Sequence, residues 1–242
     1  MTTTTIVKRE SQFFHGMQAG LSIAIGYMPV ALTFGLLSKS TGLGLSETVM
    51  MSLMVFAGAA QYISLSLLAA GTGVIEIIFT TFIVNIRHFL MSAALNEKAE
   101  EDSLWKKAIY SFGLTDETFS VASLKEGRVT AGYMFGLIFI SYSSWVINSG
   151  VGHLIGASLP TTVQESMSIA LYAMFIGLLA PSLKQHRKVV YLAVLAAIFN
   201  SLCVASNVIS TGWGIVLATI ASAVLVEIIY LKNEDKEVKT DG

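Results

Sequence analysis

An otherwise apolar stretch, residues 73–95 (GVIEIIFTTFIVNIRHFLMSAAL), carries four side chains that could do chemistry: Glu76, Asn85, Arg87 and His88. The stretch is long enough for a helix that crosses a bilayer, which takes about 20 apolar residues. A full charge near the middle of a membrane costs about 2.5 kcal/mol or more. Arg87 must therefore face a cavity, a partner charge or the lipid headgroups, and another segment must supply that environment.

A second polar segment offers such a partner. Residues 108–124 (AIYSFGLTDETFSVASL) are short for a membrane span and are interrupted by Gly113. Thr115 can cap a new half-helix that begins at Asp116 and Glu117, where the helix dipole favours carboxylates. Many transporters build a site at membrane depth from a broken helix of this kind. The alternative is an interfacial helix with both carboxylates in water.

The composition indicates an integral membrane protein. The chain has 242 residues, of which 54% are hydrophobic and 13% are charged, whereas a soluble domain has about 25% charged residues. The net charge of −1 gives no electrostatic basis for binding nucleic acid. A single cysteine, Cys203, excludes a disulfide framework and a thiolate metal site.

The residue spacing does not favour an enzyme. The histidines lie on separate elements and none has H-x-x-x-H or H-E-x-x-H spacing, so we expect no metal and no cofactor. Asp116 and Glu117 are adjacent, so on a helix they point in different directions.

The apolar runs predict an all-α, polytopic membrane bundle of about eight transmembrane segments, with one or more broken or re-entrant helices. We expect a single domain over residues 1–231, with a polar N-terminal tail (1–15) and a polar cytoplasmic tail (232–242). The glycine-rich residues 148–160 are interpreted as a loop or re-entrant turn, with His153 at an interface. The segments are expected at residues 16–37, 46–70, 73–95, 108–124, 130–147, 166–183, 189–206 and 212–231. Helix breaks are expected at Pro29, Gly35, Gly58, Gly113 and Pro181, with close helix packing as the alternative for the glycines of the first segment.

The lysines and arginines predict an orientation. With eight crossings and both termini in the cytoplasm, most of them fall on the inner side, as the positive-inside rule requires. If residues 108–124 do not cross, this parity fails and another segment must be re-entrant.

Three stretches together resemble a known family: FAGAAQY (residues 56–62), VNIRHFLMS (84–92) and GLTDETF (113–119). Pro29, the Phe34-Gly35 pair and Pro181 fit the same pattern. The chain resembles the AzlC family, the large subunit of bacterial branched-chain amino acid exporters. The resemblance implies a secondary carrier in the bacterial inner membrane that exports leucine, isoleucine and valine, and methionine in some members. It also implies a small hydrophobic partner subunit of the AzlD type.

Other classes of function remain as alternatives. The chain could be the permease subunit of an ABC-type amino acid transporter, although its short inner loops offer little for an ATPase to dock on. An oligomeric channel is a further alternative, although no pore motif is evident. Helices rich in small residues also suit self-association as well as a partner subunit.

A zwitterionic amino acid needs a cation for its carboxylate and acceptors for its ammonium. We expect Arg87, Gln61 and Asn85 to face a central cavity, with Asp116 near enough to pair with Arg87. Arg87 could then neutralise the substrate carboxylate, with Asp116 or Glu117 near the ammonium. A permanent Arg87–Asp116 ion pair that locks helices together is the alternative, as interhelical hydrogen bonding is for Gln61 and Asn85.

His88 is a candidate for proton coupling, because the usual pKa of histidine, about 6.5, lies near physiological pH. The alternative is a neutral His88 that forms a hydrogen bond within the bundle. Asp116 and Glu117 are the alternative proton carriers.

Overall fold

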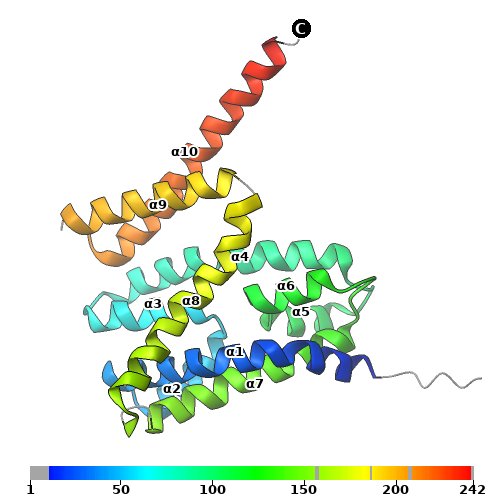
Figure 1. Ribbon diagram of the computed structural model, residues 1–242, viewed down its shortest axis with the longest axis vertical. Coiled ribbons are helices and arrows are strands. Elements are labelled where there is room, and N and C mark those ends of the chain that lie inside the picture. The colour runs from blue at the N-terminus through cyan, green and yellow to red at the C-terminus, as the bar shows by residue number, and fades with distance from the viewer. Residues whose placement is uncertain (1–10, 156–157, 186, 207–208, 241–242) are drawn as a thin grey trace, which may run out of the picture. The chain divides into compact units, whose positions relative to one another are not determined.

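The computed structural model describes residues 11–155, 158–185, 187–206 and 209–240, and side chains up to residue 230 except for part of α8 (Figure 1). Within these residues the chain is helical and contains no strand, apart from an isolated bridge between Ala99 and Val129. The helices are α1 (Gln12–Ser40), α2 (Leu45–Val55), α3 (Gly58–Ala69), α4 (Val74–Lys98), α5 (Leu104–Phe112), α6 (Asp116–Leu124), α7 (Ala131–Ile155), α8 (Thr161–Gln185), α9 (Arg187–Ser206) and α10 (Thr211–Thr240).

The all-α membrane fold predicted from the sequence is confirmed. Among the residues searched, five helices are long and apolar enough to cross a bilayer: α1, α4, α7, α9 and the Thr211–Tyr230 part of α10. Two of the predicted segments are each divided into a pair of short helices, α2 with α3 and α5 with α6. The count of eight crossings stays a prediction.

The chain divides into two compact units. The first unit contains Met1–Tyr62 and Asn85–Leu171, and the second contains Ile63–Val84 and Tyr172–Gly242. Helices α3, α4 and α8 each contribute residues to both. The single domain over residues 1–231 stays a prediction.

The first unit is organised by the packing of α1 against α7, which lie side by side in Figure 1. A Cβ atom added to Gly35 would lie 2.0 Å from the carbonyl oxygen of Ser149, so the backbones are in direct contact. Gly16 contacts the backbone of Tyr133 near the start of both helices, so the two helices run in the same direction. Further backbone contacts of this kind occur at Gly20, Gly136 and Gly152. Small residues that let backbones approach are typical of helix pairs in membranes.

The predicted breaks in the first segment are wrong. Helix α1 is continuous from Gln12 to Ser40 and contains Pro29. Gly35 lies within the same helix, at the close contact with α7, so its small size serves packing. The alternative interpretation, close helix packing, holds for this glycine.

The interpretation of residues 148–160 as a loop is wrong over its first half. Helix α7 continues to Ile155, and His153 is buried within it, with Nδ1 3.0 Å from Thr48 Oγ1. The physical reason is again packing, because a Cβ at Gly152 would lie 2.1 Å from the carbonyl oxygen of Leu32 on α1.

Two predicted boundaries near the C-terminus also differ from the structure. Helix α8 continues past position 181 to Gln185, and the side chain of Pro181 lies outside the described part. The residues expected to form a polar tail from position 232 continue helix α10 as far as Thr240.

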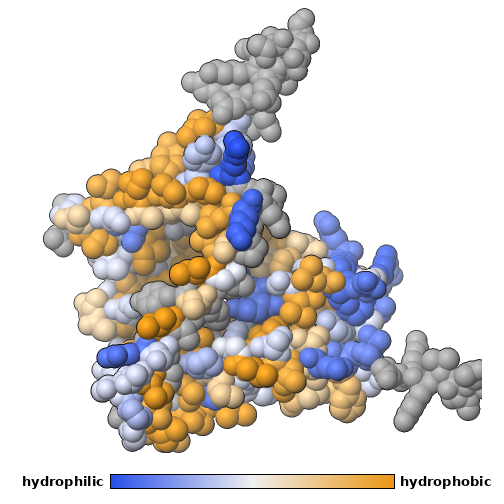
Figure 2. Space-filling model, in the orientation of Figure 1, coloured by the Kyte–Doolittle hydropathy of each residue, from blue (hydrophilic) through white to orange (hydrophobic). Residues whose placement is uncertain are grey.

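The second unit contains an antiparallel hairpin of α9 and α10. Lys188 Nζ lies 2.5 Å from Glu227 Oε2 at one end of the hairpin, and Gly214 packs against Cys203 nearer the other end. Figure 2 shows hydrophobic residues over α9. The exposed apolar side chains of α9 include Val190, Val194, Ile198 and Leu202, as expected for a helix in lipid.

We predict that Gly35→Ala destabilises the first unit by about 1–3 kcal/mol, because the added methyl group overlaps backbone atoms of α7 that cannot move independently. The measurement is the melting temperature of the detergent-purified protein, together with its abundance in membranes.

The matched control is Gly26→Ala on the same helix, where an added Cβ meets no atom within 4 Å. Alanine is favoured over glycine in a helix interior by about 1 kcal/mol, so this variant should be at least as stable as the wild type. Equal melting temperatures for the two variants would contradict the close-packing interpretation.

Candidate functional site

Helix α4 carries its polar side chains on a different side from its apolar ones. Phe82, Ile86 and Phe89 are exposed, as a lipid-facing surface requires. Asn85 and His88, which lie one turn apart, are half-buried. The 3.6-residue period of the helix thus separates the two sets, as the sequence predicts.

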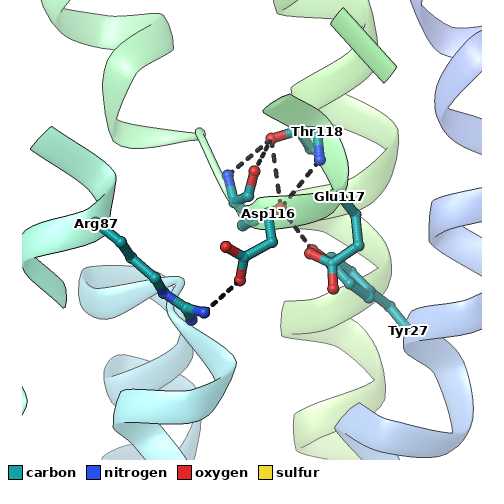
Figure 3. Close-up of polar contacts among 6 residues, drawn as sticks. Tyr27, Arg87, Asp116, Glu117 and Thr118 are labelled. Atoms are coloured by element: carbon teal, nitrogen blue, oxygen red, sulfur yellow. Dashed lines mark hydrogen bonds and ion pairs between the residues drawn. The ribbon is translucent and has the colours of Figure 1, made fainter. Parts of the chain in front are cut away.

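Arg87 forms an ion pair with Asp116. Arg87 Nη1 lies 2.7 Å from Asp116 Oδ2, and the two side chains are 36% and 25% exposed (Figure 3). Both residues belong to the first unit, although they lie on different helices. The pair is therefore partly open, so another molecule can approach it.

Asp116 is presented by the break between α5 and α6. Helix α5 ends at Phe112, with Gly113 as its C-cap, and α6 begins at Asp116. Thr115 is the N-cap, and its hydroxyl oxygen accepts a hydrogen bond from the backbone N–H of Thr118 at 3.2 Å. In return, Thr118 Oγ1 lies 2.8 Å from the backbone nitrogen of Thr115 and accepts its N–H. The new helix N-terminus places its positive dipole end beside the two carboxylates.

Glu117 points away from Asp116 and contacts Tyr27 of α1. Tyr27 donates a hydrogen bond from its hydroxyl to Glu117 Oε2 at 2.6 Å, and its Oη lies 2.7 Å from Thr115 Oγ1 (Figure 3). Tyr27 is not among the site residues predicted from the sequence. The available signal was a tyrosine inside an apolar helix, because a buried tyrosine hydroxyl usually needs a hydrogen-bond partner.

Gln61 lies in a separate polar cluster. It is fully buried, its Oε1 accepts from Trp145 Nε1 at 2.9 Å, and its Nε2 donates to Ser52 Oγ at 3.1 Å. Ser52 Oγ in turn donates to Ser149 Oγ at 2.8 Å. The contacts of Gln61 are therefore interhelical hydrogen bonds, and the structure does not bring it to Arg87.

The break between α2 and α3 lies next to this cluster. Phe56 follows α2 in the left-handed conformation, with φ 37° and ψ 46°, and α3 begins at Gly58. A Cβ at Gly58 would lie 2.9 Å from the Trp145 ring, so the residue that begins α3 must be small.

Glu76 is held in the second unit, at the start of α10. Glu76 Oε1 accepts hydrogen bonds from Ser210 Oγ at 2.5 Å and from the backbone N–H of Trp213 at 3.0 Å. The carboxylate thus satisfies a free donor of the helix N-terminus. Its contacts are structural ones.

A hollow of about 270 Å³ lies between α4 and α5, one to two turns beyond His88. It is lined by Phe89, Ser92, Ala93, Asn96, Lys107, Tyr110 and Ser111. In the part of the chain that is described, no group of three or more His, Cys, Asp or Glu side chains is arranged to hold a metal ion.

Unsatisfied polar atoms are concentrated on α4. Six buried side-chain polar atoms have no hydrogen-bond partner among the described residues, and three of them lie within one turn: Asn85 Oδ1, Arg87 Nε and His88 Nε2. The His88 ring also lies close to the backbone of Leu114, next to the α5–α6 break. Buried polar atoms without partners are uncommon and mark places where a ligand or water can bind.

Known proteins resemble this chain over most of its length. Inner membrane protein YgaZ of Escherichia coli (strain K12) is 30% identical over 225 residues, which are 90% of this chain and 86% of that protein. An uncharacterized membrane protein of Archaeoglobus fulgidus is 32% identical over 182 residues, which are 74% of this chain and 79% of that protein. The branched-chain amino acid transport protein AzlC of Bacillus subtilis (strain 168) is 22% identical over 192 residues, which are 76% of this chain and 74% of that protein.

No solved structure matches the chain. The sequence model of the family described as AzlC protein matches residues 22–159, which include Tyr27, Arg87, Asp116 and Glu117. Since that match covers more than half of the chain, and a relative is 30% identical over most of both sequences, this membrane protein belongs to the AzlC family.

Proposed function

We propose that this chain is the large subunit of a secondary carrier that exports branched-chain amino acids. The observation that carries the proposal is the concentration of unsatisfied polar atoms beside a partly open ion pair, Arg87–Asp116, on the polar side of an otherwise apolar helix. The printed name of the Bacillus relative supports this substrate class.

The cluster offers what a zwitterion requires. The guanidinium of Arg87 is planar and has five N–H donors, so it can bind a substrate carboxylate while part of it remains near Asp116. Asp116 and Glu117 are acceptors for the substrate ammonium. Asn85 Oδ1 adds an uncommitted acceptor one turn before His88 on α4.

The aliphatic tail sets the selectivity of such a site. A hydrophobic pocket discriminates by only about 1–3 kcal/mol for each methylene group. A carrier with this site would therefore accept leucine, isoleucine, valine and methionine with modest differences.

The Lys and Arg distribution and the direction of α7 support the proposed topology in the bacterial inner membrane. Since α1 and α7 run in the same direction, the chain between two such spans crosses an odd number of times. With α4 as one crossing, the α2–α3 and α5–α6 segments either both cross or both return. Both crossing is the arrangement that gives eight spans and two cytoplasmic termini.

The proposed partner is a small hydrophobic membrane subunit of the AzlD type, as the family resemblance implies. The partner is not needed for the Arg87–Asp116 pair, which this chain forms alone.

We predict that cells expressing the chain with its small subunit export leucine, isoleucine, valine and methionine faster than cells without it. An inward proton gradient should accelerate export, because an entering proton then supplies free energy to the leaving amino acid. The measurement is efflux from preloaded cells at several external pH values, with and without the small subunit.

Two further measurements distinguish a secondary carrier from an ABC permease and from a channel. Export that requires ATP in the absence of a proton gradient would indicate an ABC permease. Transport that neither saturates nor shows counter-flow in proteoliposomes would indicate a channel.

We predict that Arg87→Gln lowers leucine export at least about tenfold per molecule, because a charge-assisted hydrogen bond to the carboxylate contributes about 1.5–3 kcal/mol. Some stability should also be lost, because Asp116 is left without its partner, but less than the 3–5 kcal/mol for a fully buried pair. Abundance and export are measured on the same samples.

The matched control is Lys106→Gln, which breaks an ion pair of similar length, 2.8 Å, between the first turn of α5 and Asp102 in the charged connection before it. This control variant should change neither the abundance of the protein nor its export of leucine. Normal abundance with normal export for Arg87→Gln would refute the substrate role, whereas a loss of abundance with normal export per molecule would identify a structural ion pair.

We predict that His88→Gln makes export insensitive to external pH. The ring interacts electrostatically with Arg87, Asp116 and Glu117, so a proton on His88 would change the charge balance of the site. Efflux is measured across a series of pH gradients. A pH dependence equal to that of the wild type would remove His88 from coupling and leave Asp116 and Glu117 as the proton carriers.

A further inference from the structure

Tyr27 contacts both helix breaks of the first unit. At the α5–α6 break, its hydroxyl donates to Glu117 Oε2 at 2.6 Å and lies 2.7 Å from Thr115 Oγ1. At the α2–α3 break, its ring meets the ring of Phe56 edge to face, with 6.2 Å between the centroids. Only 4% of Tyr27 is exposed. A single buried side chain thus joins two interruptions that are far apart in the sequence.

The hydroxyl of Tyr27 has one proton, and that proton is on the bond to Glu117. Because the proton is used there, the 2.7 Å contact with Thr115 must be donated by the threonine hydroxyl. The bonds therefore run in one direction, from Thr115 through Tyr27 to Glu117. This arrangement fixes the carboxylate of Glu117 relative to the N-cap of α6.

The Phe56 end of the contact is held in a strained conformation. Phe56 is the one non-glycine residue with a positive φ among the residues described, and it is 2% exposed. Backbone of this kind persists only where its surroundings hold it. The rings of Tyr27 and Tyr142 pack on Phe56, the second with 5.0 Å between centroids.

We propose that Tyr27 is a positioning residue for the transported amino acid, which it serves by holding the Glu117 carboxylate in the orientation that receives the substrate ammonium. The inference rests on the proposed function and adds a residue that acts through Glu117.

The test is Tyr27→Phe, which removes the hydroxyl and keeps the ring contacts with Phe56 and Trp145. Because the carboxylate loses a charge-assisted hydrogen bond, we expect the KM for leucine export to rise about tenfold with little change in the maximal rate. KM does not depend on the amount of protein, so a loss of abundance does not obscure the result.

The matched control is Tyr62→Phe. Its hydroxyl donates to the backbone carbonyl of Val30 at 2.7 Å and is also buried, so this variant loses a comparable hydrogen bond away from Glu117. Its KM should equal that of the wild type. An equal rise in KM for both variants would show that Tyr27 is only structural.

A double-variant cycle tests whether Tyr27 acts through Glu117. Glu117→Asp shortens the side chain by one methylene group and withdraws the carboxylate from the hydroxyl. In the Glu117→Asp background, Tyr27→Phe should not raise KM further. If the two residues acted independently, the rise in KM of the double variant would instead be the product of the rises in the two single variants. Where export is too slow to measure, leucine protection against thermal unfolding of the purified variants gives the same comparison.

The outcomes separate the two proposals. Wild-type protein that neither exports nor binds leucine would overturn the proposed function, and the role of Tyr27 with it. Wild-type export with an unchanged KM for Tyr27→Phe, or with multiplying effects in the cycle, would overturn the role of Tyr27 alone.

Discussion

The guanidinium of Arg87 can lie on an apolar helix because Asp116 lies 2.7 Å away. An unpaired charge in a membrane is costly, so this pairing lowers the free energy of placing Arg87 on that helix. Asp116 can reach Arg87 because the chain breaks at Gly113 and begins a new helix at Asp116. The break, the Thr115 cap and the ion pair therefore depend on one another.

The two polar clusters of the first unit differ in how completely they are satisfied. Gln61, Trp145 and Ser52 use their side-chain hydrogen-bonding groups on one another, which is typical of a cluster that joins helices. The α4 cluster leaves Arg87 Nε and His88 Nε2 without partners among the described residues. This difference is a physical reason to assign binding to α4 and structure to Gln61.

Support for both clusters comes from α1 and α7. Their backbones touch at Gly16 near one end and at Gly35 near the other, which fixes the register of the two helices along most of their length. Tyr27 of α1 and Trp145 of α7 are thereby held with 5.1 Å between their ring centroids, next to the two helix breaks. A closely packed helix pair thus lies beside two interrupted helices, and interrupted helices are an arrangement that transporters use at membrane depth.

The sequence by itself determined the membrane class, the positions of most helices and the α5–α6 break, because these follow from local composition, glycine and capping residues. It also indicated that Arg87 needs a partner and offered Asp116, since few other charges lie in apolar segments. Only the tertiary structure decided that Gly35 and Gly152 serve packing, that Gln61 bonds to Trp145 and that Tyr27 holds Glu117. These contacts join residues tens of positions apart, and a helical period shows which side a residue occupies without showing which helix lies opposite.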